Sequence, residues 1–157
     1  MFLACPAQYQ FRAENTPQHS QPAIMVRGKF AHLFYDSYVC CCLLEDSMQL
    51  LTEIDAIAED VYQEGVRTAV ANGEPFLSPV EWADVVAKLC RPWAERTAIP
   101  VDAIRHTEYR WAVANNGNQV DFDDDTAFMR GVLDRWDETG EPGTRNCRIV
   151  DYKTGFG

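Results

Sequence analysis

The stretch that decides the fold is GVLDRWD at residues 131–137, together with IVDYKTG at residues 149–155. Between the two, Glu141-Pro142-Gly143-Thr144 has proline and then glycine at its centre, which is the composition of a type II turn. The two stretches are therefore predicted to form the arms of an antiparallel hairpin. A turn centred on that proline and glycine places Asp134 directly opposite Asp151.

This register has a chemical consequence for three charged residues. Direct partners in an antiparallel pair have Cβ atoms about 4.5–5.5 Å apart, and two carboxylates at that distance repel each other. A divalent cation between Asp134 and Asp151 would offset the repulsion, and Lys153 points to the same face because side chains alternate along a strand. The three residues are a candidate hydrolytic metal site. The alternative is a solvated hairpin whose charges coincide by chance, since a register can slip by one residue.

The rest of the chain changes character along its length. Apolar residues in the first hundred positions recur with the helical period of 3.6, and residues after 105 alternate as strands do. Helices are predicted over residues 6–13, 26–44 and 48–71 and from a capping box at Ser78 to about Pro92. Strands are predicted from about Ile104, over residues 126–137 and over residues 146–153.

A second hairpin is predicted at Asn116-Gly117, a pair typical of two-residue turns. Centring the turn there places Val113 opposite Val120 and Trp111 opposite Phe122. We therefore expect residues 1–157 to form a single α/β domain, with a mostly antiparallel central sheet flanked by helices and a helical N-terminal half.

Composition limits the possible functions. The chain carries 24 acidic and 14 basic residues and a net charge of −10, which argues against a generic basic nucleic-acid binder but not against an enzyme that meets phosphates through bound cations. The cysteines have no Cys-x-x-Cys spacing, which argues against a zinc finger. No apolar stretch is long enough for a membrane span or a signal peptide, so we expect a cytoplasmic protein. Cysteines interpreted as small buried apolar residues are Cys40, Cys41, Cys42, Cys90 and Cys147.

Five motifs in order resemble those of a known superfamily. The hairpin stretches resemble the core of the PD-(D/E)xK nucleases, restriction-endonuclease-like enzymes, and most closely the RecB-like exonuclease branch. That branch includes the nuclease domains of helicase–nucleases and the CRISPR-associated iron–sulfur nucleases. The further motifs, which extend the resemblance over residues 5–155, are CPAQYQFR at residues 5–12, GKFAH at residues 28–32 and EYRW at residues 108–111.

The resemblance implies roles for particular residues. His32, Asp134, Asp151 and the carbonyl of Tyr152 would bind Mg²⁺ or Mn²⁺, for which hard oxygen ligands and one imidazole are suited. Lys153 would orient the attacking water and stabilise charge on the phosphate. Glu108 would support the site from the neighbouring strand, and with the two aspartates and the lysine it completes the catalytic set. A histidine hydrogen-bonded in the core is the alternative interpretation of His32.

Two departures from the family pattern affect what we expect. Relatives continue past the Asp-x-Lys strand into a helix that carries a glutamine and a tyrosine, and that stretch is absent here, so we expect a fragment whose activity on its own is open. Iron–sulfur relatives pair the first cysteine with three more near the carboxyl terminus. Cys5 is therefore a ligand of a 4Fe–4S cluster only in a longer form of the protein, and otherwise a packed cysteine.

The implied function is a metal-dependent DNA exonuclease acting in DNA repair, recombination or nucleic-acid processing. The implied substrate is single-stranded DNA or DNA ends. The implied protein partner is a helicase or another recombination protein, and we expect no association with a membrane. The alternative is a non-catalytic nuclease-like module that binds DNA or protein.

Overall fold

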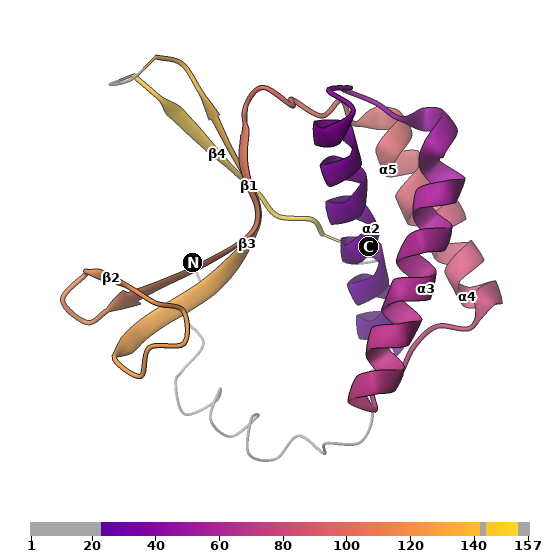
Figure 1. Cartoon of the computed structure of the whole chain (residues 1–157), viewed down its shortest axis with the longest axis horizontal. Helices are drawn as coiled ribbons and strands as arrows, with labels where there is room; N and C mark the ends of the chain where they lie inside the picture. Colours follow the sequence, from indigo (N-terminus) through magenta and orange to yellow (C-terminus); the bar gives the residue numbers. More distant parts are fainter. Residues whose placement is uncertain (1–22, 142–143, 154–157) are drawn as a thin grey trace.

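The computed structural model describes residues 23–141 and 144–153. A layer of helices from the first half of the chain lies to one side of a sheet from the second half (Figure 1). This confirms the predicted α/β class; the helix predicted over residues 6–13 lies outside the described residues. The elements are α2 (Ala23–Leu44), the 3₁₀ turn η1 (Leu51–Glu53), α3 (Ile54–Asn72), α4 (Pro79–Val85), the π-helical turn η2 (Val86–Cys90), α5 (Arg91–Arg96), β1 (Ile104–Ala114), β2 (Gln119–Val120), β3 (Ala127–Thr139) and β4 (Asn146–Val150).

Helix α2 is the centre of the helical layer because apolar side chains cover more than one of its faces. Phe30, Phe34 and Tyr38 are all buried. The ring centroid of Phe30 lies 5.8 Å from that of Trp82 on α4 and 6.3 Å from that of Tyr62 on α3. These contacts hold α2 against both neighbouring helices and leave its remaining side for the sheet.

Helix α3 begins later than its sequence predicts and ends where expected. Residues 48–50 leave the helix because their backbone bonds elsewhere: the Leu50 N–H donates to the Tyr38 hydroxyl at 2.8 Å, and the Met48 carbonyl accepts the Ile99 N–H at 2.9 Å. At the other end Gly73 adopts φ +66° and closes the helix by donating to Val70. This is the predicted glycine cap.

The helix that begins at the Ser78 capping box continues past the predicted end at Pro92. The capping box is present, but the helical path runs through η2 and α5 to Arg96. A proline lacks an N–H and crowds the carbonyl four residues before it. The wider π-helical turn of η2, in which hydrogen bonds span five residues, accommodates Pro92 without ending the path.

The sheet is antiparallel, in the order β2-β1-β3-β4. The β3–β4 hairpin has the predicted register, with Arg135 opposite Val150. The predicted register of β1–β2 is wrong by one residue, because Val120 lies opposite Ala112 rather than Val113. Gly117, at φ +82°, donates its N–H to the Ala114 carbonyl at 2.9 Å, so the loop has three residues instead of two.

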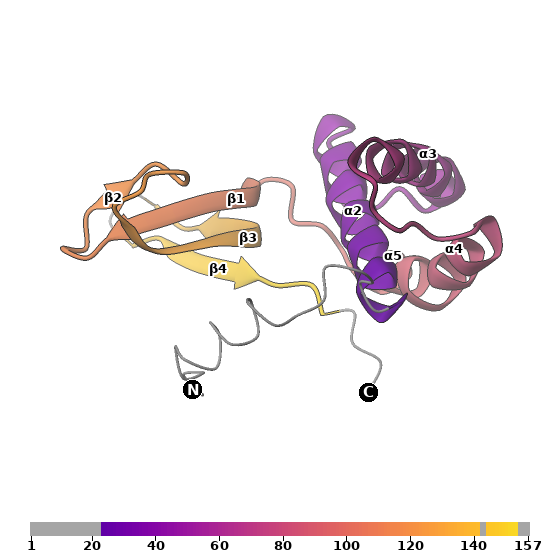
Figure 2. The ribbon, with the colours of Figure 1, turned by 90° about the horizontal axis from the view of Figure 1, so that it is seen from below.

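The two layers share one apolar core. Ile104 on β1 and Tyr152, just after β4, are buried in the same cluster as the helical residues. Figure 2 shows the segment after β4 running toward α2 and α5. Within residues 23–141 and 144–153, no helix is long and apolar enough to cross a membrane.

The cysteines divide by position in this core. Cys42 and Cys90 are buried as predicted, and Cys40 and Cys41 are half-buried. The prediction is wrong for Cys147, which is exposed because β4 is an edge strand.

Candidate active site

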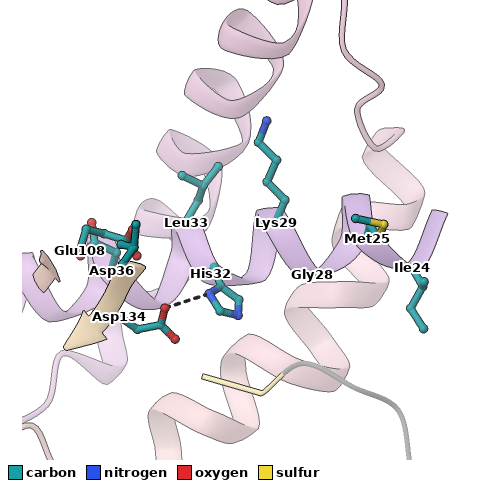
Figure 3. Close-up of a pocket in the computed structure, with 10 residues that line it drawn as sticks. Ile24, Met25, Gly28, Lys29, His32, Leu33, Asp36, Glu108 and Asp134 are labelled. Carbon is teal, nitrogen blue, oxygen red and sulfur yellow. Dashed lines mark ion pairs between the residues drawn. The ribbon is translucent and has the colours of Figure 1, made fainter. Parts of the chain in front are cut away.

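The side chains of His32 and Asp134 meet where α2 faces β3 (Figure 3). Nδ1 of His32 lies 3.7 Å from Oδ1 of Asp134, and the two side chains are 32% and 14% exposed. Both groups are thus accessible to a small ligand and partly shielded from water. The structure brings together two of the residues to which the sequence assigns metal binding.

A cavity of about 710 Å³ opens beside this pair. Figure 3 shows the carboxylates of Asp36, Glu108 and Asp134 at the same end of it. Its other lining residues are mostly apolar: Ile24, Met25, Gly28, Lys29, Leu33 and Val132.

Glu108 on β1 occupies the ladder position across from Asp134. The flanking pairs are Thr107 with Arg135 and Tyr109 with Leu133. The backbone of Glu108 has φ +47°, which side-chain-bearing residues rarely adopt and which is concentrated at functional sites. Burial raises the pKa of the Glu108 carboxyl. The negative charges of Asp36 and Asp134 raise this pKa further, whereas His32 lowers it.

Asp36 is a residue of this cavity that the sequence analysis missed. Burial raises the pKa of the Asp36 carboxyl. A hydrogen bond from Thr107 lowers this pKa, and the negative charge of Asp134 raises it. Its Oδ1 atom is buried and finds no hydrogen-bond partner among the described residues. The available signal was its spacing of four from His32, which places the two side chains on one face of a helix.

Asp134 is held from a second direction by the segment after β4. The backbone N–H of Tyr152 donates to Oδ2 of Asp134. The strand predicted to reach Lys153 ends at Val150, so the predicted cross-strand pair of Asp134 with Asp151 is not part of the ladder. The register is right, but the Asp134 carboxylate takes the N–H of Tyr152, and the chain leaves the sheet toward the helices.

Asp151 and Lys153 form an ion pair with each other at the surface, with side chains 55% and 81% exposed. This pairing raises the pKa of Lys153, and Asp134 raises it as well. Both residues line a neighbouring cavity of about 240 Å³ that Tyr35 and Trp93 also line. The predicted site residues are therefore divided between two adjacent cavities, with the charge of Asp134 acting on both.

The chemistry of the donors fits a hard divalent cation, although the donors are spread apart in this structure. Carboxylate oxygens and one imidazole are the donors that Mg²⁺ and Mn²⁺ accept, and the buried oxygen of Asp36 is one such donor. In the part of the chain that the structure describes, no three His, Cys, Asp or Glu side chains are grouped closely enough to hold a metal ion. Cys5 lies outside the described residues.

The fold and site define a class of α/β protein with an acidic centre beside the end of an antiparallel hairpin. A model of the PD-(D/E)XK nuclease superfamily matches residues 1–156. The chain belongs to this superfamily, whose members are typically metal-dependent nucleases, and the superfamily predicted from the motifs is confirmed. No curated protein and no solved structure shows a significant match to the chain.

Proposed function

We propose that the protein is a metal-dependent DNA exonuclease of the RecB-like branch. The observation that carries this proposal is the contact between His32 and Asp134. It joins the Gly-x-x-x-His helix to the strand that bears the first catalytic aspartate. The order of the motifs along the chain supports the choice of branch.

The proposed ligands are His32, Asp134, Asp151 and the carbonyl of Tyr152, and the proposed cation is Mg²⁺ or Mn²⁺. When bound, the cation supplies an activated water as nucleophile and stabilises the leaving oxygen. Asp151 has to exchange Lys153 for the cation, and a side chain that is 55% exposed is free to rotate. Glu108 supports the site from β1.

Lys153 then has a separate task. Once Asp151 turns to the cation, the ammonium group is released to orient the attacking water and to face the phosphate. A positive charge there stabilises the negative charge that develops during phosphodiester hydrolysis. Its side chain is 81% exposed, so it can move toward a substrate.

The proposed substrate and partners are those that the branch implies. Single-stranded DNA or DNA ends are the proposed substrates, with a role in repair, recombination or nucleic-acid processing. A helicase or another recombination protein is the proposed partner, and the cytoplasm the proposed location. A 4Fe–4S cluster bound through Cys5 belongs only to a longer form.

A second candidate function is a non-catalytic nuclease-like module that contacts DNA or protein. The observation that favours it is the lack of any three-residue metal-binding group among the described residues. The two candidates differ in metal binding and in DNA degradation.

Thermal unfolding with EDTA, Mg²⁺ or Mn²⁺ tests the ligands. Either metal should raise the Tm of the wild type, because a ligand that binds only the native state stabilises it. Asp134→Asn should lose the shift. The matched control Asp123→Asn, which alters an exposed carboxylate, should keep it, and an equal shift in all three proteins would contradict the proposal.

Degradation of end-labelled single- and double-stranded oligonucleotides tests the reaction. The expected result is metal-dependent shortening from the ends, in this chain or in a version extended past Gly157. Metal binding without degradation in both versions would favour the non-catalytic module.

A further inference from the structure

Arg135 and Asp137 on β3 are the two charged residues that are buried in the described part of the chain, at 1% and 3% exposure. Arg135 donates to Asp137 through two nitrogens, Nε to Oδ1 at 2.8 Å and Nη2 to Oδ2 at 3.1 Å. Arg148 on β4 also approaches Asp137, with Nη2 3.1 Å from Oδ2. The guanidinium of Arg135 is thus fixed in plane and direction.

One nitrogen of this guanidinium remains for another partner. Nη1 of Arg135 donates to the hydroxyl of Tyr152 at 3.4 Å. Tyr152 packs its ring between the layers, with ring centroids 5.1 Å from Tyr35, 5.5 Å from Trp93 and 6.1 Å from His32. The buried ion pair therefore reaches the tyrosine that lies between the two exposed site residues.

Tyr152 is tethered to β3 at both of its ends. Its hydroxyl is held by Arg135, and its backbone N–H by Asp134. The β3–β4 ladder ends at Val150, so ladder hydrogen bonds do not hold residues 151–153. The two tethers come from neighbouring residues of one strand and replace the missing ladder bonds.

We propose that Arg135, fixed by Asp137, is a positioning residue that acts through the Tyr152 hydroxyl to set the backbone at residues 151–153 relative to Asp134. Its role in catalysis rests on the proposed function, in which the Tyr152 carbonyl, Asp151 and Lys153 work together with Asp134. A loose backbone there would move all three at once.

Stability alone is a weak explanation for this pair. Taking two charges out of water costs free energy that their attraction only partly restores, so a buried ion pair is poor evidence of a gain in stability. A planar guanidinium held by two bonds does, however, aim its remaining donor in one direction. That property matches a positioning role.

Amide hydrogen exchange measures the proposed effect directly. Tyr152→Phe removes one hydroxyl and keeps the ring, so the fold should be retained. We expect exchange at the amide of residue 152 to become about five to ten times faster, because the loss of one hydrogen bond destabilises the closed state by that order. The amides of the β3–β4 ladder should keep their exchange rates. Tyr109→Phe is the matched control, because it removes the hydroxyl of a half-buried tyrosine on β1 that accepts only from Gln119 among the described residues, and it should change neither.

A purely structural role would have a different signature: protection would fall equally across the ladder and at residue 152, or at neither, and either result would overturn the proposal. As a second test, Arg135→Met combined with Asp137→Leu removes both buried charges together and avoids leaving one unpaired. This double variant should also exchange faster at residue 152, and unchanged exchange in a folded double variant would overturn the proposal as well.

The exchange measurement does not depend on nuclease activity, so the two proposals fail separately. If the wild type degrades DNA, Tyr152→Phe should lower kcat with little change in KM, because the site is misaligned while DNA binding is kept. Faster exchange in a protein that degrades no DNA would retain the positioning role and reject the nuclease function. If the wild type degrades DNA but exchange at residue 152 stays slow in Tyr152→Phe, the nuclease function is retained and the positioning role is rejected.

Discussion

Nδ1 of His32 and Oδ1 of Asp134 are 3.7 Å apart, although one residue belongs to α2 and the other to β3. The contact links the helical layer to the sheet, as do the packing of α2 against β1 and the burial of Tyr152 in the shared core. It lies at the polar end of the larger cavity, so the geometry of the proposed site depends on how the two layers are held together.

Replacing Lys153 by alanine should separate catalysis from metal binding. The variant keeps His32, Asp134 and Asp151, so the metal-induced rise in Tm should remain. Removing a group that stabilises developing charge should lower the rate of DNA hydrolysis by about 10²–10³-fold. The Tm without metal should change little, because exposed ion pairs contribute little to stability.

The control for this prediction is Lys88→Ala, which removes an exposed lysine paired with Asp84 on the helical layer. Its hydrolysis rate should equal that of the wild type. A Lys153→Ala protein that degrades DNA as fast as the wild type would contradict the role assigned to Lys153.

The backbone at Glu108 predicts an unusual ranking of substitutions. In a strand, glycine is ordinarily less stable than alanine by about 0.5–1 kcal/mol. At φ +47° an alanine retains a strain of about 1–2 kcal/mol that glycine escapes. Glu108→Gly should therefore be more stable than Glu108→Ala, as measured by urea unfolding, whereas the ordinary ranking would show that the strain is absent.

Gly65 on α3 should not tolerate a methyl group. A Cβ atom at this position would lie 2.8 Å from Cε1 of Phe30, a buried ring that Trp82 and Tyr62 hold in place. Overpacking of this kind costs about 1–3 kcal/mol, more than the helix propensity that alanine gains over glycine. Gly65→Ala should lower the free energy of unfolding in urea.

The smaller side chain in Phe30→Leu should relieve that clash. In a double-mutant cycle, Gly65→Ala should then cost less than it does in the wild type. Equal costs in the two backgrounds would show that the methyl group is accommodated elsewhere.

The buried thiol of Cys90 predicts a loss of stability in alkali. Burial raises the pKa of Cys90 from its ordinary value of 9.0 to about 12. Between those values the unfolded chain has released the proton and the native chain retains it, so the free energy of unfolding falls as pH rises. Cys90→Ala should make this fall shallower, by up to about 1.4 kcal/mol per pH unit.

Urea unfolding at several pH values above 9 measures this slope. Cys147→Ala removes an exposed thiol and should leave the slope unchanged. Identical slopes for wild type and Cys90→Ala would mean that Cys90 is not buried in the native state.

The two hairpins show which features of the sheet can be predicted from sequence. The β3–β4 register follows from local turn chemistry around residues 142 and 143 and agrees with the structure. The β1–β2 register also depends on local chemistry, but Asn-Gly suits a two-residue loop and a three-residue loop alike. The choice between them lies in the conformation of Gly117, which the residue types leave open.

The helical errors have causes outside the helices themselves. Residues 48–50 have the apolar pattern of a helix, yet Tyr38 and Ile99 take the hydrogen bonds of their backbone. Pro92 disrupts the hydrogen bonding of an ordinary α-helix, and the π-helical turn before it accommodates the proline while the path continues to Arg96. Neither the distant partners nor the turn has a periodicity that a single sequence reveals.

At the candidate site, the sequence predicts residue types better than their arrangement. Motifs singled out His32, Glu108 and Asp134, which the structure places in one cavity. Asp36 belongs to no motif quoted for the family. It lies in the cavity because it follows His32 by four residues on α2, which places both side chains on one face of the helix. Asp151 and Lys153 instead pair with each other, because two exposed opposite charges close in sequence attract each other.

The tether between Tyr152 and Asp134 has a consequence for the order in which the protein matures on the ribosome. Chains fold from the N-terminus as they are synthesised, so α2 emerges with His32 long before Asp134 exists. Even then Asp134 lacks its second contact until residue 152 is made, and the shared core lacks the Tyr152 ring. A chain whose synthesis stops before residue 152 therefore carries no assembled centre, and the cell that makes the protein is not exposed to its proposed chemistry until synthesis has passed that residue.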